Sequence, residues 1–556
     1  MDKIKLVLFL GLLPLYVSCF HEKNASVILA KEKNKFLIKD SIVNSSCVAW
    51  GSLQDDISNT GWSYLEVHTN PSYSDSFQAY AAGLVEGYLT ADLISKHWNN
   101  LYVHYCKNEK EYCDKLKRFL ETNMDFMNKN IQKNKTDSYW KHVALVLEQV
   151  KGLQDGYKGT PSLPDTRPDI MGVMLFNLFG DLLDLEIILN KTDRNHIIDN
   201  GHCSALIKFL PGYKDLYVAH DTWNNYTTML RILKKYVMPL RINTTENSKI
   251  IPGHTTSFSS YPGCIFSGDD FYIISSGLLA LETSITNTNT SSFQYVIPDR
   301  VVLEWIRSIV ANRLATGGRN WADIFSLFNS GTYNNQWMLV DYKKFVPNNK
   351  PESELLWILE QLPNCIESKD QTNTLIRHGY WPSYNRPYYS NIFNMSGFPE
   401  LAKKYGDYFT YDRAPRALIF KRDQEKVTDL KTMINLMRYN DFKNDPLSRC
   451  NCTPPYSANY AIAARLDLNP PNGTFPFPSL ENAAYGSIDM KLTSYSMQKN
   501  YEFIAYSGPT FDQQPIFKWS TSIFSHMPHS GHPDEWKFDL VLHHWLQLQH
   551  FHVFTN

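Results

Sequence analysis

The sequence predicts an α+β protein, and three observations carry that prediction. Apolar residues recur at helical spacing before residue 203, in the segments 76–102, 139–153 and 171–189. Short strand-like runs then follow at 204–210 and 215–220. Helical spacing returns at 294–315, and the remainder mixes short strands with turns rich in Gly, Pro and Asn. We therefore expect a mostly helical N-terminal part and a mixed α and β remainder, an α+β or layered α/β arrangement.

The chain begins with a predicted secretory signal peptide over 1–19. Lys3 and Lys5 precede an apolar run at 6–16, and small residues follow at 17–19. The run is shorter than the roughly 20 residues that a membrane-spanning helix needs, and no later segment of that length lacks charged residues. We therefore expect no transmembrane segment, and a mature protein on the luminal or extracellular side.

Composition excludes some classes of function. Of the 556 residues, 43% are hydrophobic and 20% are charged, which is typical of a globular protein with a large core. A formal net charge of −1 provides no basic excess for binding nucleic acid. The 17 histidines would make the chain cationic in an acidic compartment, because their unperturbed pKa is about 6.5. Contact with anionic membrane surfaces at acid pH is one interpretation, and ordinary surface histidines are the other.

Ten Asn-x-Ser/Thr sequons behind a signal peptide predict a heavily glycosylated protein. They begin at Asn24, Asn44, Asn134, Asn190, Asn225, Asn243, Asn289, Asn394, Asn451 and Asn472. The sequence also predicts two local disulfides, Cys106–Cys113 and Cys450–Cys452, which an oxidising compartment permits.

A group of C-terminal histidines invites a metal-binding interpretation. Their spacing is irregular, and no cysteine or glutamate completes a ligand set. We therefore expect neither a metal site nor a cofactor. The histidines are His526, His529, His532, His543, His544, His550 and His552.

Cys203 is the strongest candidate for a catalytic nucleophile. The chain lacks the G-x-S-x-G, Walker A, H-E-x-x-H and G-x-G-x-x-G motifs, which disfavours the enzymes that use them. A cysteine in a nucleophile elbow lies between a strand and a helix, whereas Cys203 follows a polar loop and precedes a strand pattern. That order fits an N-terminal nucleophile, whose own α-amino group serves as base once the preceding peptide bond is cut. A buried structural cysteine is the alternative.

A hairpin would bring further polar side chains to Cys203. With a four-residue turn at 211–214, Cys203 lies opposite Thr222, and His220 lies two residues away on the same face. Asp221 points to the opposite face in this register. A one-residue slip would separate Cys203 from both partners, so the register is open to test.

From these residues onward the sequence resembles the phospholipase B-like family of lysosomal or secreted N-terminal nucleophile hydrolases. The segment 329–337, with the sequence NSGTYNNQW, is the most specific match. The other matching blocks are 203–208, 220–223, 259–263, 269–272, 275–278, 281–283, 341–342, 414–417 and 531–533, with Trp536. The resemblance implies a four-layer αββα fold and autocatalytic cleavage between His202 and Cys203. A small chain, 20–202, and a large chain, 203–556, would then stay together.

Chemistry suggests a role for each remaining candidate. Cys203 would be the nucleophile, and His220 and Thr222 would position its thiol or its freed amine. An oxyanion needs preorganised donors, and among the three asparagines of 329–337 we choose Asn334.

Three charged residues of the matching blocks remain to be assigned. Arg416 would bind a substrate phosphate or orient the carboxyl side of Cys203, and an ordinary salt bridge is the alternative. Asp269 and Asp270 are adjacent, so on a strand they would face opposite ways, and we interpret them as structural.

The predicted function is removal of fatty acyl chains from phospholipids by an autocatalytically processed cysteine hydrolase. An amidase acting on N-acyl lipids or peptides is a second hypothesis, because the family is close in fold to amidases. A glycosylated lipid-binding protein with negligible turnover is a third, in which Cys203 serves maturation alone. The sequence leaves open whether the chain forms a homodimer.

Overall fold

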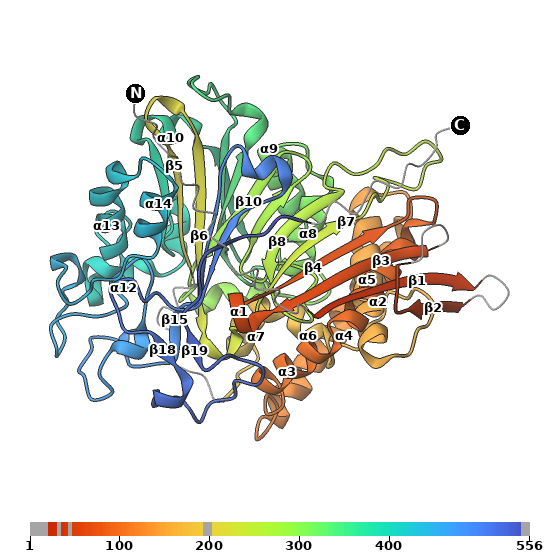
Figure 1. The fold of residues 1–556 in the computed structure, drawn as a ribbon, viewed down its shortest axis with the longest axis horizontal. Coiled ribbons are helices and arrows are strands. Elements are labelled where there is room, and N and C mark those ends of the chain that lie inside the picture. The colour runs from red at the N-terminus through yellow and green to blue at the C-terminus, as the bar shows by residue number, and fades with distance from the viewer. Residues whose placement is uncertain (1–20, 31–34, 43–46, 193–202, 546–556) are drawn as a thin grey trace, which may run out of the picture.

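Two large β-sheets organise the structure (Figure 1). The computed structural model describes residues 21–30, 35–42, 47–192 and 203–545. Strands and helices alternate along much of this length, and the prediction of an α+β protein is confirmed. Within these ranges no helix combines the length and the apolar character needed to cross a membrane.

The larger sheet has eleven strands within the described residues. In spatial order they are β13 (Cys365–Asp370), β12 (Leu356–Leu362), β11 (Asn335–Asp341), β10 (Leu278–Ser284), β9 (Phe271–Ile274), β8 (Thr255–Ser260), β7 (Ile232–Val237), β4 (Trp62–Thr69), β3 (Cys47–Asp56), β1 (His21–Ala30) and β2 (Lys35–Lys39). Their pairing is antiparallel except between β4 and β7, which run parallel. That parallel pair joins the N-terminal strands to those that follow residue 203.

The second sheet contains Cys203. Its strands are β14 (Tyr380–Ser383), β5 (Cys203–Phe209), β6 (Leu216–Asn225), β16 (Asp489–Thr493), β17 (Ile504–Ser507) and β20 (Val541–Leu542), with β15 (Tyr485–Ser487) also paired to β6. A separate pair is formed by β18 (Phe517–Lys518) and β19 (Glu535–Trp536).

The helices lie before, between and after these strands. They are α1 (Ile57–Thr60), α2 (Asp75–Leu89), α3 (Ala91–Leu101), α4 (Lys110–Lys133), α5 (Ser138–Lys158), α6 (Met174–Asn177), α7 (Phe179–Ile188), α8 (Glu304–Leu314), α9 (Gly318–Phe325), α10 (Thr372–His378), α11 (Ser390–Met395), α12 (Phe398–Tyr405), α13 (Pro415–Asp423) and α14 (Leu430–Met437).

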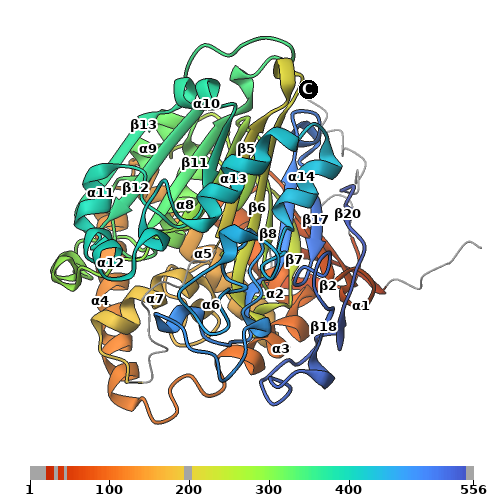
Figure 2. The same cartoon turned by 90° about the vertical axis from the view of Figure 1, so that its left-hand side faces the viewer.

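Apolar side chains form a core on each face of both sheets. Between the sheets, Ile207 on β5 packs in the same cluster as Leu279 on β10. The other face of the larger sheet is covered by α2, α5, α8 and α9. The other face of the second sheet is covered by α13 and α14, which Figure 2 shows in front of β5 and β6. Both faces of β5 are buried. Its sequence, CSALIKF, is therefore mostly apolar and does not alternate between apolar and polar residues.

The predicted helices exist, but their lengths and surroundings differ from expectation. The segment 76–102 forms two helices that meet at Thr90, and 171–189 forms two that meet at Leu178. Of 294–315 only α8 is an α-helix, because Pro298 lacks the backbone N–H that a helix interior needs. The expectation of a mostly helical N-terminal part also missed four strands, β1 to β4.

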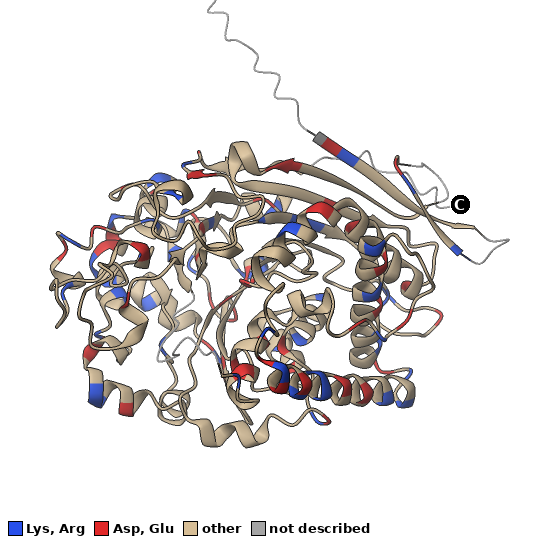
Figure 3. Cartoon of the chain, turned by 90° about the horizontal axis from the view of Figure 1, so that it is seen from below, with Lys and Arg blue, Asp and Glu red and all other residues tan. Residues whose placement is uncertain are grey.

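The predicted disulfides and glycosylation sequons can be located in this fold. The disulfides Cys106–Cys113 and Cys450–Cys452 are both present. Nine of the sequon asparagines lie among the described residues, and none of those nine is buried. Asn44 lies outside the described residues. Lys and Arg are interspersed with Asp and Glu over the ribbon (Figure 3), in agreement with the balanced formal charge.

Four glycines allow α2 and α5 to touch backbone to backbone. A Cβ atom on Gly83 would lie 1.9 Å from the carbonyl oxygen of Gln149, and one on Gly152 would lie 2.0 Å from that of Tyr80. Gly87 and Gly156 repeat the arrangement one turn further on. No side chain fits at these positions unless the helices separate.

We therefore predict that Gly152→Ala lowers the free energy of unfolding by about 1–3 kcal/mol, because overpacking moves the two helices apart. Thermal unfolding would show a lower Tm. Gly317→Ala is the control, since a Cβ there would meet only Asp341 Oδ2, at 3.6 Å. Equal Tm values for the two variants would contradict the close helix contact.

Candidate active site

The hairpin of β5 and β6 places Cys203 as the sequence predicts. Its turn is closed by a hydrogen bond from the Leu210 backbone N–H to the Asp215 carbonyl oxygen, 3.0 Å long. Cys203 pairs with Thr222, and Ala205 pairs with His220. The register is confirmed, so Cys203, His220 and Thr222 share the face turned toward the larger sheet.

The Cys203 thiol lies in a closed environment, with 1% of the residue exposed. Burial raises the pKa of this thiol well above its usual range, and the nearby Glu282 carboxyl raises it further. Lys491 and the backbone N–H of Trp223 lower the pKa of the thiol, but by less. The thiol is therefore protonated in the intact chain and needs a base before it can attack.

Thr222 connects Cys203 to a fully buried group of charges. Its Oγ1 donates to Asp269 Oδ2 at 2.7 Å, and its backbone N–H donates to Asp489 Oδ1 at 3.0 Å. Arg231 and Lys491 each bridge these two carboxylates, at 2.5–2.8 Å. Two cations thus balance two anions, as buried charges require.

The balance of these charges fixes the state of Asp269. Burial alone would raise the pKa of its carboxyl, but Arg231 and Lys491 outweigh burial and hold it below the usual range. Asp269 is therefore ionised next to Thr222, the residue paired with Cys203. Lys491 also donates to Thr222 Oγ1 at 2.5 Å, so the ammonium group holds the hydroxyl in place.

His220 is neutral, and its hydrogen bond identifies the tautomer. Burial lowers its pKa well below the usual range, and the cation of Lys491 lowers it further. Nε2 lies 2.9 Å from the carbonyl oxygen of Glu282. A carbonyl oxygen can only accept, so Nε2 carries the proton and Nδ1 carries a lone pair. Nδ1 is buried and has no hydrogen-bond partner among the described residues.

Arg416 forms a hydrogen bond on the carboxyl side of Cys203. Its Nη1 donates to the Cys203 carbonyl oxygen at 2.7 Å, and its Nη2 donates to Asn385 Oδ1 at 2.8 Å. The guanidinium lies 4.2 Å from the centre of the Trp223 ring. These contacts lie on the carboxyl side of Cys203, and no acidic side chain is among them.

Asn334 is held in a turn and makes no hydrogen bond to Cys203, His220 or Thr222 in the described structure. Its Nδ2 donates to the Gly331 carbonyl oxygen at 3.0 Å. The neighbouring Asn335 is fully buried at the start of β11, and neither atom of its amide has a partner among the described residues. The side chain with unused donors is thus that of Asn335.

The remaining candidates divide into those that contact the site and those that do not. Asp269 belongs to the charged group, whereas Asp270 turns away and accepts from Tyr272 Oη at 2.8 Å. Both precede β9, so a positive φ of 46° at Asp270, and not strand alternation, separates them. Asp221 is buried on the opposite face, as expected, with neither carboxyl oxygen bonded to a described residue. His202 lies outside the described residues.

Sequence reasoning missed Arg231, Asp489 and Lys491. Lys491 is separated from Thr222 by 269 positions, so no local motif connects them. The sequence of β16, DMKLT, alternates polar and apolar residues although every position is buried. That alternation is the signal that could have indicated a buried polar face.

The C-terminal histidines are dispersed. Among the described residues no group of three or more His, Cys, Asp or Glu side chains could hold a metal ion. His529 stacks on Trp519, and His543 stacks on Tyr64. His550 and His552 lie outside the described residues.

A group of buried carboxyl side chains extends from the site toward α7 and α8. Burial is the main cause that raises the pKa of Asp181 to about 6, of Asp184 to about 7 and of Asp270 to about 8. Burial and neighbouring carboxyls raise the pKa of Glu282 and Glu304 well above the usual range. Neither carboxyl oxygen of Glu304 has a partner among the described residues.

We predict that Glu304→Gln stabilises the protein at pH 7.5 but changes little at pH 4.5. In the folded protein Glu304 stays protonated, whereas in the unfolded chain it ionises above about pH 4.3. Its contribution to the free energy of unfolding is therefore complete below that pH and falls as the pH rises. Glutamine does not ionise, so the variant does not lose this free energy of unfolding as the pH rises. The measurement is Tm of both proteins at both pH values.

The exposed Glu121 supplies the control for that experiment. Glu121→Gln should leave Tm within about 1 °C of the parent at either pH, because exposed substitutions cost little. A gain in Tm from Glu304→Gln that is equal at the two pH values would contradict a buried, protonated carboxyl.

The fold and site define a mixed α and β protein with a buried candidate thiol nucleophile at the start of a strand. The family model for Phospholipase B matches residues 49–543, and the chain belongs to this family.

Three relatives illustrate the similarity. "Putative phospholipase B-like 2" of Rattus norvegicus is 52% identical over 505 residues, which cover 90% of this chain and 86% of the relative. The protein of the same name from Homo sapiens is 49% identical over 530 residues, covering 94% and 90%. "Phospholipase B-like protein B" of Dictyostelium discoideum is 40% identical over 510 residues, covering 90% and 86%.

Proposed function

We propose that this chain is an N-terminal nucleophile hydrolase that cuts itself between His202 and Cys203 and then removes fatty acyl chains from phospholipids. The observation that carries the proposal is the position of Cys203 at the start of a buried strand, beside Thr222 and its charged partners. Membership of the family supports the hydrolase class. The core between two facing sheets, with helices on their outer faces, supports the four-layer αββα assignment.

Self-cleavage would proceed as a shift of an acyl group from nitrogen to sulfur. The Cys203 sulfur attacks the His202 carbonyl carbon, the C–N bond breaks, and a thioester and a free α-amino group form. Water then opens the thioester, which leaves a carboxylate on His202 and restores the thiol. The products would be the small chain, 20–202, and the large chain, 203–556.

The first of these steps needs a base other than the α-amino group, which is still part of the peptide bond. His220 presents a neutral imidazole with an unpartnered Nδ1 on the face that carries Cys203. Diagonal neighbours on paired strands are within reach of a long side chain. We assign His220 to this step.

After cleavage the freed amine takes over as base, because an α-amino pKa of about 7.7–8.0 suits that task. The thiolate attacks the carbonyl carbon of a lipid ester, the ester C–O bond breaks, and the alcohol leaves with a proton. Water hydrolyses the resulting thioester to release the fatty acid. Arg416 and the charged group at Thr222 hold the nucleophile, and one of the asparagines of 329–337, Asn334 by our choice, would donate to the oxyanion.

The proposal predicts that Cys203→Ala abolishes both cleavage and turnover. Intact mass and N-terminal sequencing of the parent protein, after incubation at acid pH, should find a chain that begins at Cys203. Cys264→Ala is the matched control, because Cys264 is also a buried free cysteine but belongs to another core. A single uncut parent chain would contradict the mechanism.

A second experiment distinguishes the esterase from an amidase that acts on N-acyl lipids or peptides. Processed protein is given paired lipids that differ only in an ester or an amide at the acyl bond, and the fatty acid released is quantified. We expect release from the ester at a rate that Cys203→Ala reduces to background. Release from the amide alone would overturn the substrate assignment, and binding without release would favour a lipid-binding protein.

A further inference from the structure

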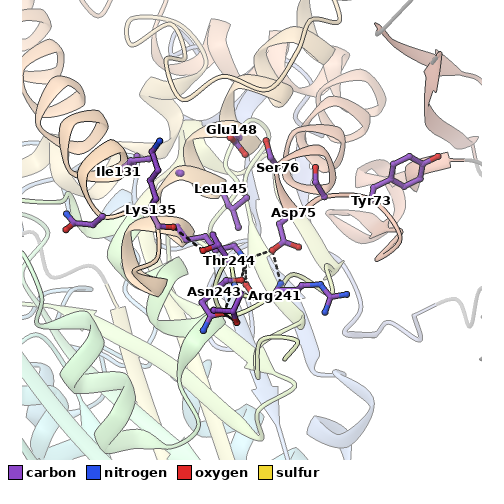
Figure 4. Close-up of a pocket in the computed structure, with 15 residues that line it drawn as sticks. Tyr73, Asp75, Ser76, Ile131, Lys135, Leu145, Glu148, Arg241, Asn243 and Thr244 are labelled. Atoms are coloured by element: carbon purple, nitrogen blue, oxygen red, sulfur yellow. Dashed lines mark hydrogen bonds and ion pairs between the residues drawn. The ribbon is translucent and has the colours of Figure 1, made fainter. Parts of the chain in front are cut away.

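A second feature of the molecule is a pocket of about 410 Å³, which none of the candidate active-site residues lines. It lies between the start of α2, the end of α4 and the first turns of α5 (Figure 4). Apolar atoms come from Ile131 and Leu145, and polar atoms come from Ser76, Glu148 and Thr244. A concave site that combines apolar atoms with polar groups is typical of a site for a small ligand.

Two sequons meet at the rim of this pocket. Asn134 directly follows α4, and Asn243 follows β7, yet both line the pocket. Thr244 Oγ1 donates to the Lys135 carbonyl oxygen, a contact of 3.4 Å that joins the two sequons directly. An N-linked sugar on either asparagine would begin at the pocket.

The geometry favours Asn243 over Asn134 as the attachment point. Asn243 Oδ1 accepts from both the N–H and the Oγ1 of Thr245, at 3.1 and 2.6 Å, and its own N–H donates to Ser248. Its Nδ2, the atom that bears a glycan, makes no hydrogen bond with a described residue. By contrast, Asn134 Nδ2 donates to the Asn130 carbonyl oxygen at 3.0 Å.

The polar atoms around the pocket suit a polar ligand such as a sugar. Lys141 and Asp75 pair at 2.5 Å, and Lys135 and Arg241 also line the pocket, where they add positive charge. Burial raises the pKa of Glu148 to about 7, so this carboxyl is protonated in an acidic compartment. Its buried Oε2 has no partner in the described part of the chain. Hydroxyl and N-acetyl groups can bond to such atoms without bringing in an unpaired charge.

We propose that the pocket seats the first sugars of an N-glycan carried by Asn243. The seated glycan would connect the segment after β7 to α4 and α5, which are far from it in sequence. The inference depends on glycosylation of this sequon and is independent of the proposed hydrolase function.

The test uses the protein secreted from eukaryotic cells. Glycopeptide mass spectrometry first measures occupancy, and a time course with an endoglycosidase on the native protein then follows release from each site. Asn394, whose side chain is exposed, is the reference. We expect Asn243 to be occupied and its glycan to be released at least about tenfold more slowly, because only the unseated fraction is cleaved. An unoccupied Asn243, or equal release rates, would overturn the proposal.

Three variants distinguish a glycan that is seated in the pocket from one that is only crowded by the neighbouring glycan. Ala144→Phe fills the pocket from α5 and should raise release from Asn243 to the rate at Asn394, whereas Ala91→Phe on α3, outside the pocket, should not. Asn134→Gln removes the neighbouring glycan and should leave release from Asn243 slow. Fast release in Asn134→Gln, or slow release in a folded Ala144→Phe, would contradict the seated glycan.

Discussion

The buried group formed by Arg231, Lys491, Asp269 and Asp489 is the interaction on which the candidate site depends. Arg231 and Asp269 lie next to strands of the larger sheet, whereas Asp489 and Lys491 lie on the second sheet. Each ion is fully buried and therefore needs its opposite charges. The group thus fixes the distance between the sheets at the point where Thr222 holds the strand of Cys203.

The parallel pairing of β4 with β7 places a second constraint on the fold. It hydrogen-bonds a strand from before the proposed cleavage point to one from after it, and the α2–α5 pair then covers the joined sheet. A cut between residues 202 and 203 would leave this pairing intact. The two proposed chains would therefore remain one folded unit because they share a sheet, with no need for an interface of the kind that separate subunits form.

Local features of the fold could be predicted from sequence, and features that depend on distant partners could not. The β5–β6 register followed from a short turn and strand alternation, both of which act over a few residues. The strands β1 to β4 were missed although β1–β2 and β3–β4 are local hairpins, because the prediction for this part was drawn from helical spacing after residue 76. The parallel pairing of β4 with β7 has no local signal, because β7 is far along the chain. Lys491 was missed because its partner Thr222 is also far away in the sequence. Sequence alone also does not show that the turn at Gly331 already uses the amide of Asn334.

The burial of Cys203 has a consequence for the life of the protein in the cell. The proposed lipid hydrolase would be made beside membranes that contain its own substrates. In the intact chain the thiol is protonated, 1% of the residue is exposed, and the amine that would activate it is locked in a peptide bond. The uncut chain would then be a zymogen, harmless to the compartments it passes through, and the timing of a single internal cut would decide where lipid degradation begins.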